Sequence, residues 1–187
     1  GAGNAGDLDA WLASNGGASA TDACSGVTWS NDFDALSDDC GATGAATVTF
    51  TATDDCGNAT STTATFTIED TTAPAVMDAM DATVECDGAG NAADLDAWLA
   101  SNGGASATDA CSGVTWSNDF DALSDDCGAT GAATVTFTAT DDCGNATSTT
   151  ATFTIEDTTA PAVMDAMDAA VECDGAGNAA DLDAWLA

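Results

Sequence analysis

The sequence contains no Lys, Arg, His or Tyr, although 32 of its 187 residues are Asp or Glu. Side-chain salt bridges are therefore excluded, and each carboxylate must stay hydrated, accept hydrogen bonds, raise its pKa or bind a cation. The formal charge of −32 argues against nucleic acid and anionic membranes as partners, because both attract basic side chains. Without His there is no Ser–His or Cys–His pair, and we expect no enzymatic activity.

The chain also lacks an apolar run long enough to span a membrane, and no signal peptide is visible. Its first residue is Gly rather than Met, so we expect a mature product or part of a longer protein. Acidic composition often accompanies disorder. Here 45% of the residues are hydrophobic, and Trp, Phe and Val recur at regular positions, which favours a folded core.

Cysteine is abundant, but no two cysteines form a CxxC motif. An even number at regular spacing, without His, favours disulfides over zinc or redox chemistry and predicts an extracellular location. The eight cysteines are Cys24, Cys40, Cys56, Cys86, Cys111, Cys127, Cys143 and Cys173.

The sequence repeats itself with a period of 87 residues. The segment GAGNAGDLDAWLA begins at Gly1, and GAGNAADLDAWLA begins at Gly88 and again at Gly175. Both prolines fall in the segment IEDTTAP, which we take as the boundary between copies. We therefore predict an immunoglobulin-like first repeat over 1–73 that lacks its opening strands, a complete second repeat over 74–160, and the start of a third repeat over 161–187.

Apolar residues alternate with Thr in the second repeat and predict strands. AATVTFTAT places Val135, Phe137 and Ala139 on one face, and TTATFTIE does the same with Phe153 and Ile155. The segment DDCGN between them predicts a tight hairpin turn. Three further segments, ATVEC, AVMDAM and GVTWSNDF, predict additional strands.

The segment NAADLDAWLASNGG instead has helical spacing, with Leu95, Trp98 and Leu99 on one face. Asn91 is a candidate N-cap, and Asn102 with Gly103 a candidate stop. Trp98 and Trp116 are interpreted as core residues rather than sugar platforms. Short strands and one short helix in a unit of this size predict a mainly β fold, with tandem immunoglobulin-like antiparallel β-sandwich domains that each contain two disulfides. An open α+β layer is the alternative.

Taken together, these segments resemble the HYR-like, immunoglobulin-related repeats of large surface and secreted proteins of Bacteroidota. The resemblance spans the full length and is carried by VECDGAGNAADLDAWLASNGGASATDACSGVTWSND, LSDDCGATGAATVTFTATDDCGN and TATFTIEDTTAP. It implies an exported β-sandwich array, often adhesive or fibrous, with no catalysis. The chain departs from the usual family pattern in having no Lys, Arg, His or Tyr.

Strand order suggests how the cysteines pair. If GVTWSNDF and AATVTFTATDD are antiparallel neighbours, the cysteines that flank them meet at common poles. This arrangement predicts the bonds Cys24–Cys56, Cys111–Cys143 and Cys86–Cys127. Cys40 and Cys173 would then be unpaired or joined across copies, and sequential pairing of Cys24 with Cys40 is the competitor.

The carboxylates cluster in turns, where hard oxygen ligands suit calcium. At the end of one repeat, Glu69 and Asp70 are expected to face the turns of the next, and a bound Ca²⁺ would stiffen the joint. The alternative is a hydrated acidic surface that keeps the protein soluble. The predicted ligands are Glu69, Asp70, Asp109, Asp141 and Asp142, together with Asp54 and Asp55 of the first repeat.

Two weaker signals remain. The segment DGAGNAAD over 87–94 partly matches an EF-hand loop but lacks the ligands at its third and twelfth positions, so a turn before a helix is favoured. The DTT segments place Thr71 and Thr158 as candidate glycosylation sites, against an ordinary Thr-rich linker. The sequence as a whole predicts a structural protein of an extracellular fibre or surface array, partnered by further copies of itself. An adhesin stalk and a carbohydrate-binding array are the alternatives.

Overall fold

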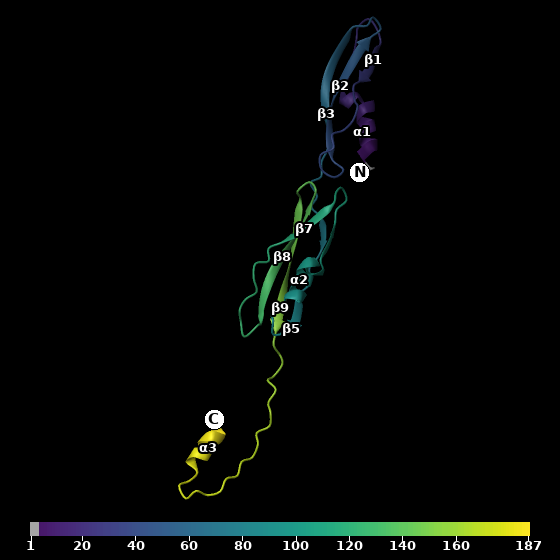
Figure 1. Cartoon of the computed structure of the whole chain (residues 1–187). Coiled ribbons are helices and arrows are strands. Elements are labelled where there is room, and N and C mark those ends of the chain that lie inside the picture. Colours follow the sequence, from purple (N-terminus) through teal and green to yellow (C-terminus); the bar gives the residue numbers. More distant parts are fainter. Residues whose placement is uncertain (1–3) are drawn as a thin grey trace. The chain divides into compact units, whose positions relative to one another are not determined.

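The computed structural model describes residues 4–187 and is mainly β. The chain separates into two compact parts, a main part over Gly1–Asp157 and a C-terminal part over Thr158–Ala187. In chain order, the elements are α1 Asn4–Ala13, η1 Asn15–Gly17, β1 Val27–Asn31, β2 Gly44–Asp54, β3 Ala59–Ile68, β4 Ala75–Met77, β5 Ala82–Glu85, α2 Ala92–Ala100, η2 Asn102–Gly104, β6 Ser106–Thr108, β7 Val114–Asn118, β8 Gly131–Asp141, β9 Ala146–Glu156 and α3 Ala179–Leu186 (Figure 1).

In the main part, each repeat contributes one antiparallel hairpin with a neighbouring strand. The first repeat forms the sheet β1-β2-β3, and the second forms β5-β9-β8-β7. A two-stranded sheet of β4 and β6 completes the second repeat. The predicted antiparallel pairing of β7 with β8 is confirmed, with Trp116 opposite Ala139. The alternation of apolar residues with Thr therefore predicted the strands and their neighbours correctly.

One strand pairing differs from the all-antiparallel prediction. The strand β5 pairs parallel to β9, with Val84 opposite Ile155. A parallel pair needs a long connection, and the segment 86–145 between the two strands supplies it. The strand alternation cannot reveal this direction, because it fixes which side chains point inward but not which way a neighbour runs.

The core of the second repeat lies between the sheet and α2. Val135, Phe137 and Phe153 are almost fully buried, as predicted, and Leu95 and Trp98 of α2 pack against them. The Trp98 ring meets the Phe137 ring edge-on, with centroids 5.2 Å apart. Its Nε1 donates a hydrogen bond to the Met80 carbonyl at 3.1 Å. The prediction that Trp98 is a core residue is therefore confirmed.

The helix signals were read correctly, but the start of α2 is held in a different way. Asn91 precedes α2 with a left-handed backbone, φ 49°, and its side chain makes no capping bond to the helix. Instead, the Asn91 amide donates to the Glu85 carbonyl at 3.0 Å, and its oxygen accepts from the Asp87 N–H at 3.1 Å. Asp87 in turn accepts from the Ala89 and Asn91 N–H groups. The segment 87–94 is thus a hydrogen-bonded turn that leads into the helix.

Candidate functional site at the junction of the two repeats

A disulfide joins the first repeat to the second. The Sγ atoms of Cys40 and Cys143 are bonded, with a Cα–Cα distance of 5.2 Å and 103 positions between them in the sequence. Cys40 lies in a turn before β2, and Cys143 lies in the hairpin turn between β8 and β9. The bond therefore connects a turn of one copy with a turn of the next.

The predicted disulfide pairing is corrected by this bond. Cys111–Cys143 is wrong because Cys143 bonds to Cys40, and neither Cys24–Cys56 nor Cys86–Cys127 forms among residues 4–187. The sequential competitor Cys24–Cys40 does not form either. The part of the chain described here thus holds one disulfide in place of two per repeat, and its free thiols are those of Cys24, Cys56, Cys86, Cys111, Cys127 and Cys173.

The physical reason is that the pairing was deduced inside a single repeat. Cys111 and Cys143 do lie beyond the same end of the β7–β8 pair, where Val114 is opposite Asp141. At that end, however, the turn of the preceding repeat supplies Cys40 as a closer partner. The alternative that Cys40 is joined across copies is confirmed.

Two hydrogen bonds accompany the disulfide at this junction. The Ala42 N–H donates to the Cys111 carbonyl at 2.9 Å. The Asn145 side-chain amide donates to the Asp70 carbonyl at 3.1 Å. The junction therefore has a covalent bond and backbone-directed hydrogen bonds, which restrict movement between the joined turns.

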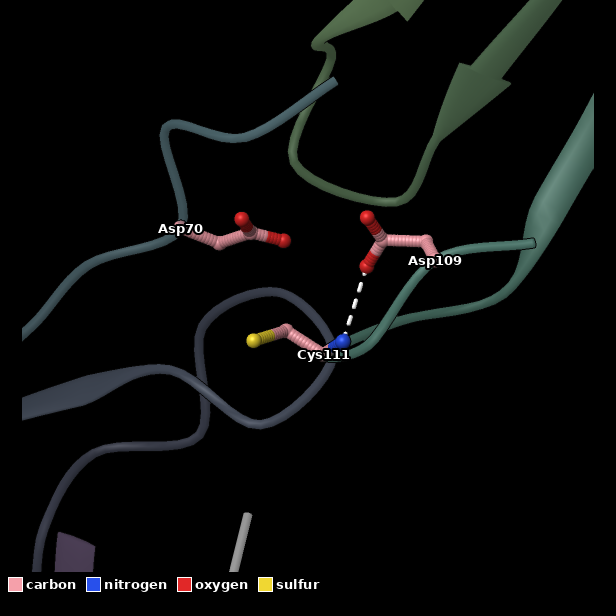
Figure 2. Close-up of side chains that lie close together, drawn as sticks. All are labelled: Asp70, Asp109 and Cys111. Carbon is pink, nitrogen blue, oxygen red and sulfur yellow. Dashed lines mark hydrogen bonds between the residues drawn. The ribbon is translucent and has the colours of Figure 1, made fainter. Parts of the chain in front are cut away.

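Beside the disulfide, two carboxylates and a thiol come close together. One ligand atom from each of Asp70, Asp109 and Cys111 lies within 4.8 Å of the others. Figure 2 shows the carboxyl groups of Asp70 and Asp109 facing each other, with Cys111 next to them. The Cys111 N–H donates to Asp109 Oδ1 at 2.8 Å, so this turn holds both ligand groups in place.

One oxygen in this cluster has no partner. Asp70 Oδ2 is buried and makes no hydrogen bond among the described residues, whereas Asp70 Oδ1 accepts from the Thr72 N–H at 3.1 Å. A buried carboxylate oxygen without a donor is costly unless a cation or water binds it. The donor set of two carboxylates and one thiol fits a divalent cation. Calcium would need further oxygens, and zinc could also use the thiolate.

The remaining predicted ligands do not join this cluster. Asp141 accepts from the Asn145 backbone and side chain, both at 2.8 Å, and Asp54 makes the same bonds with Asn58. Asp142 Oδ2 accepts from the Gly113 N–H at 3.0 Å. These aspartates shape hairpin turns. Two further members of the predicted set lie elsewhere, Asp55 on the Gly26 N–H and Glu69 at the exposed wall of a hollow beside the disulfide.

Sequence reasoning missed Cys111 as a candidate ligand. It assumed that all thiols would be consumed in disulfides, and the free Cys111 thiol contradicts that assumption. The signal was present in the segment ATDAC, where Asp109 and Cys111 are two residues apart. The predicted glycosylation site Thr71 follows Asp70 directly and is exposed, as is Thr158 in the C-terminal part.

The hairpin aspartates make a prediction about pH. Hydrogen bonds from the Asn58 side chain and backbone lower the pKa of Asp54 below its ordinary value of 3.8. Burial raises the pKa of Asp141, but bonds from the Asn145 side chain and backbone outweigh it and lower the pKa. A lowered folded-state pKa stabilises the fold above the unfolded pKa, and this contribution is lost as the pH falls through the folded pKa.

We therefore expect both hairpins to be unaffected between pH 7 and pH 5 and to weaken below about pH 4. Carboxyl NMR titration should give both aspartates pKa values under 3.8. Asp141→Asn should remove this pH dependence at its own hairpin and leave that of Asp54 unchanged. Loss of the hairpin amide signals already at pH 5 would contradict the assignment.

None of the three helices among residues 4–187 has the length and apolar character needed to cross a membrane. A scan against protein-family models finds no match, and a search of curated proteins finds no related sequence. The case for a function therefore depends on the residues of the junction and on the repeat itself.

Proposed function

We propose that the protein is a structural component of an extracellular fibre or surface array, built from tandem immunoglobulin-like repeats. The observation that carries the proposal is the Cys40–Cys143 disulfide between two copies of the repeat. A bond at this position adds a second covalent connection to the one that the backbone makes, and such bonds persist in oxidising surroundings. The resemblance to HYR-like repeats of secreted proteins supports the same function and location.

The absence of basic residues is consistent with this role. With 32 acidic residues and no cation of its own, the surface repels other acidic surfaces and stays soluble. Trypsin cleaves only after Lys and Arg and has no site in this chain. A protein with these properties is suited to long exposure outside the cell.

Electron microscopy of the purified protein under oxidising conditions tests the proposal. A fibre component is expected to form filaments or end-to-end contacts without other proteins. The first alternative, an adhesin stalk, would give separate rods that scatter as extended monomers. The second, a carbohydrate-binding array, would be retained on polysaccharide in a way that a Trp→Ala substitution abolishes. Separate rods at every concentration would contradict the fibre.

We also propose that a divalent cation stiffens the junction, with Asp70 and Asp109 as ligands and calcium as the predicted ion. The buried, unpartnered Asp70 Oδ2 supports this step. The cation would neutralise two facing carboxylates that have no basic residue to balance them. Zinc is the second candidate, because the Cys111 thiol lies in the same cluster.

Calcium at ten times its dissociation constant should stabilise the protein by about 1.4 kcal/mol, which raises the melting temperature by roughly 3–6 °C. Asp109→Asn should abolish the rise. Asp22→Asn is the matched control, because Asp22 accepts the same turn bonds from Cys24 and Ser25 in the first repeat. If zinc is the ion, Cys111→Ser should abolish the rise as well. A melting temperature unmoved by millimolar calcium, zinc and chelator would contradict the cation.

A further inference from the structure

The two repeats provide an internal comparison of the same sheet with and without a covering strand. The strand β9 lies between β8 and β5, whereas β3, its counterpart in the first repeat, has only β2 beside it among residues 4–187. Phe153 and Ile155 of β9 are 1% and 3% exposed. Their counterparts Phe66 and Ile68 are only half-buried. The outer edge of β3 is therefore open, and its inward side chains lack cover.

The segment that covers β9 occurs a second time in the chain. Residues 75–85 read AVMDAMDATVE, and residues 162–172 read AVMDAMDAAVE. The second copy forms no strand in the described C-terminal part, and Val163, Met164 and Met167 are 87%, 92% and 84% exposed. The chain thus carries both an open strand edge and an unpaired copy of the segment that closes this edge in the second repeat.

The unpaired copy already holds the local arrangement that its counterpart has when packed. Trp185 Nε1 donates to the Met167 carbonyl at 3.3 Å, as Trp98 does to Met80 at 3.1 Å. The Asn178 side chain donates to the Glu172 carbonyl at 2.8 Å, the counterpart of the bond from Asn91 to Glu85. Such preorganisation lowers the entropy lost on binding.

What this C-terminal part lacks is a sheet to pack against. Leu182 and Trp185 of α3 are 53% and 57% exposed, whereas Leu95 and Trp98 of α2 are 8% and 9% exposed. Together with Val171, Leu182 and Trp185 line an apolar hollow (α3 is yellow in Figure 1). The face that α2 packs on the second repeat's sheet is therefore open to solvent on α3.

We propose that residues 162–187 of one copy dock on the first repeat of a second copy of this chain. The inference rests on the proposed function, since it supplies the contact through which copies join. By the register of β5 on β9, Ala169–Glu172 pair parallel to the segment 66–69, with Val171 opposite Ile68. The helix α3 then takes the place of α1 in the second copy.

The docking segment is too short to close on its own molecule. By the register of β4 on β6, Val163 would lie opposite Ala20 in the first repeat. The seven residues from Asp157 to Val163 span at most about 25 Å. The strand β9 alone, which runs from the junction hairpin to Glu156, is about 37 Å long. The segment therefore reaches the first repeat of another copy and not that of its own chain.

The helix α1 holds its position less firmly than α3 would. Trp11 occupies the site that Trp98 fills in the second repeat, with its ring centroid 5.2 Å from that of Phe50. At the third residue of the helix, however, α1 has Gly6 where α3 has Ala180. Glycine inside a helix is less stable than alanine. Exchange of α1 for α3 is therefore favoured by the one sequence difference between the two helices.

Sedimentation velocity of the full chain tests the proposal. We expect species at multiples of 18.2 kDa that grow with concentration. Val171→Asp should raise the dissociation constant about a hundredfold, because it places a charge against Ile68. Ala170→Asp is the matched control, since it adds the same charge on the outward side of the same strand and should change the constant less than threefold. Gly6→Ala should raise the constant about threefold by stabilising α1.

The outcomes separate this inference from the proposed function. If the parent chain associates and Val171→Asp and Ala170→Asp behave alike, strand exchange is overturned and self-assembly stands. If the parent chain stays at 18.2 kDa at every concentration, both are overturned. Neither substitution lies in the main part, so the circular dichroism of all variants should match that of the parent.

Discussion

Cys40→Ser is expected to lower the free energy of unfolding by about 4–5 kcal/mol. The bond that it removes closes a loop across 103 positions, and the chain-entropy model assigns about this value to a loop of that size. Urea denaturation under oxidising conditions, at concentrations too low for self-association, measures the loss. The effect should vanish when parent and variant are compared under a strong reductant.

The repeat supplies the control for this experiment. Cys127 occupies the position of Cys40 in the second repeat and is a free thiol in this chain. Cys127→Ser should therefore change stability by less than about 0.5 kcal/mol. Equal losses for Cys40→Ser and Cys127→Ser would show that the serine substitution itself, rather than the missing disulfide, destabilises the protein.

Phe153→Ala should destabilise the protein by about 3–5 kcal/mol, because Phe153 is 1% exposed and packs against Trp98. The same substitution at Phe66 should cost roughly half as much, because this ring is only half-buried although Trp11 contacts it. Urea denaturation at low protein concentration compares the two variants. Equal costs would mean that the edge of β3 is covered in solution.

This comparison also depends on concentration. If a second copy covers the edge of β3, the ring of Phe66 becomes buried as the protein associates. The cost of Phe66→Ala should then approach that of Phe153→Ala at concentrations where the parent chain is assembled. A cost that is independent of concentration would argue against docking at this edge.

The strands and the core could be predicted from the sequence because they depend on neighbours close in the chain. Alternation with Thr determines which of Val135, Phe137 and Ala139 point inward, and helical spacing does the same for Leu95 and Trp98. All five are buried as predicted. The hairpin turn and the end of α2 followed from the preference of Gly and Asn for positive φ, seen at Asn102, Gly103 and Gly144.

The junction could be predicted only in part. Repetition implies that the end of one copy meets the turns of the next, and Asp70 does lie near Asp109. Pairing of Cys143 with Cys40 instead of Cys111 depends on how two turns from different copies approach each other. No local pattern contains that distance, and the two thiols compete at the same end of the sheet. The free Cys111 thiol could not be predicted for the same reason.

Identification of the disulfide tests the central claim most directly, namely that a covalent bond between turns of consecutive repeats makes this chain a structural element. The segments around Cys40 and Cys127 are identical, and so are those around Cys56 and Cys143, so a Cys56→Ser/Cys127→Ser variant is needed to assign the bond. After non-reducing digestion with an Asp-specific protease, mass spectrometry should find the Cys40 peptide linked to the Cys143 peptide. A Cys143 peptide that is free, or linked to the Cys111 peptide, would contradict the account.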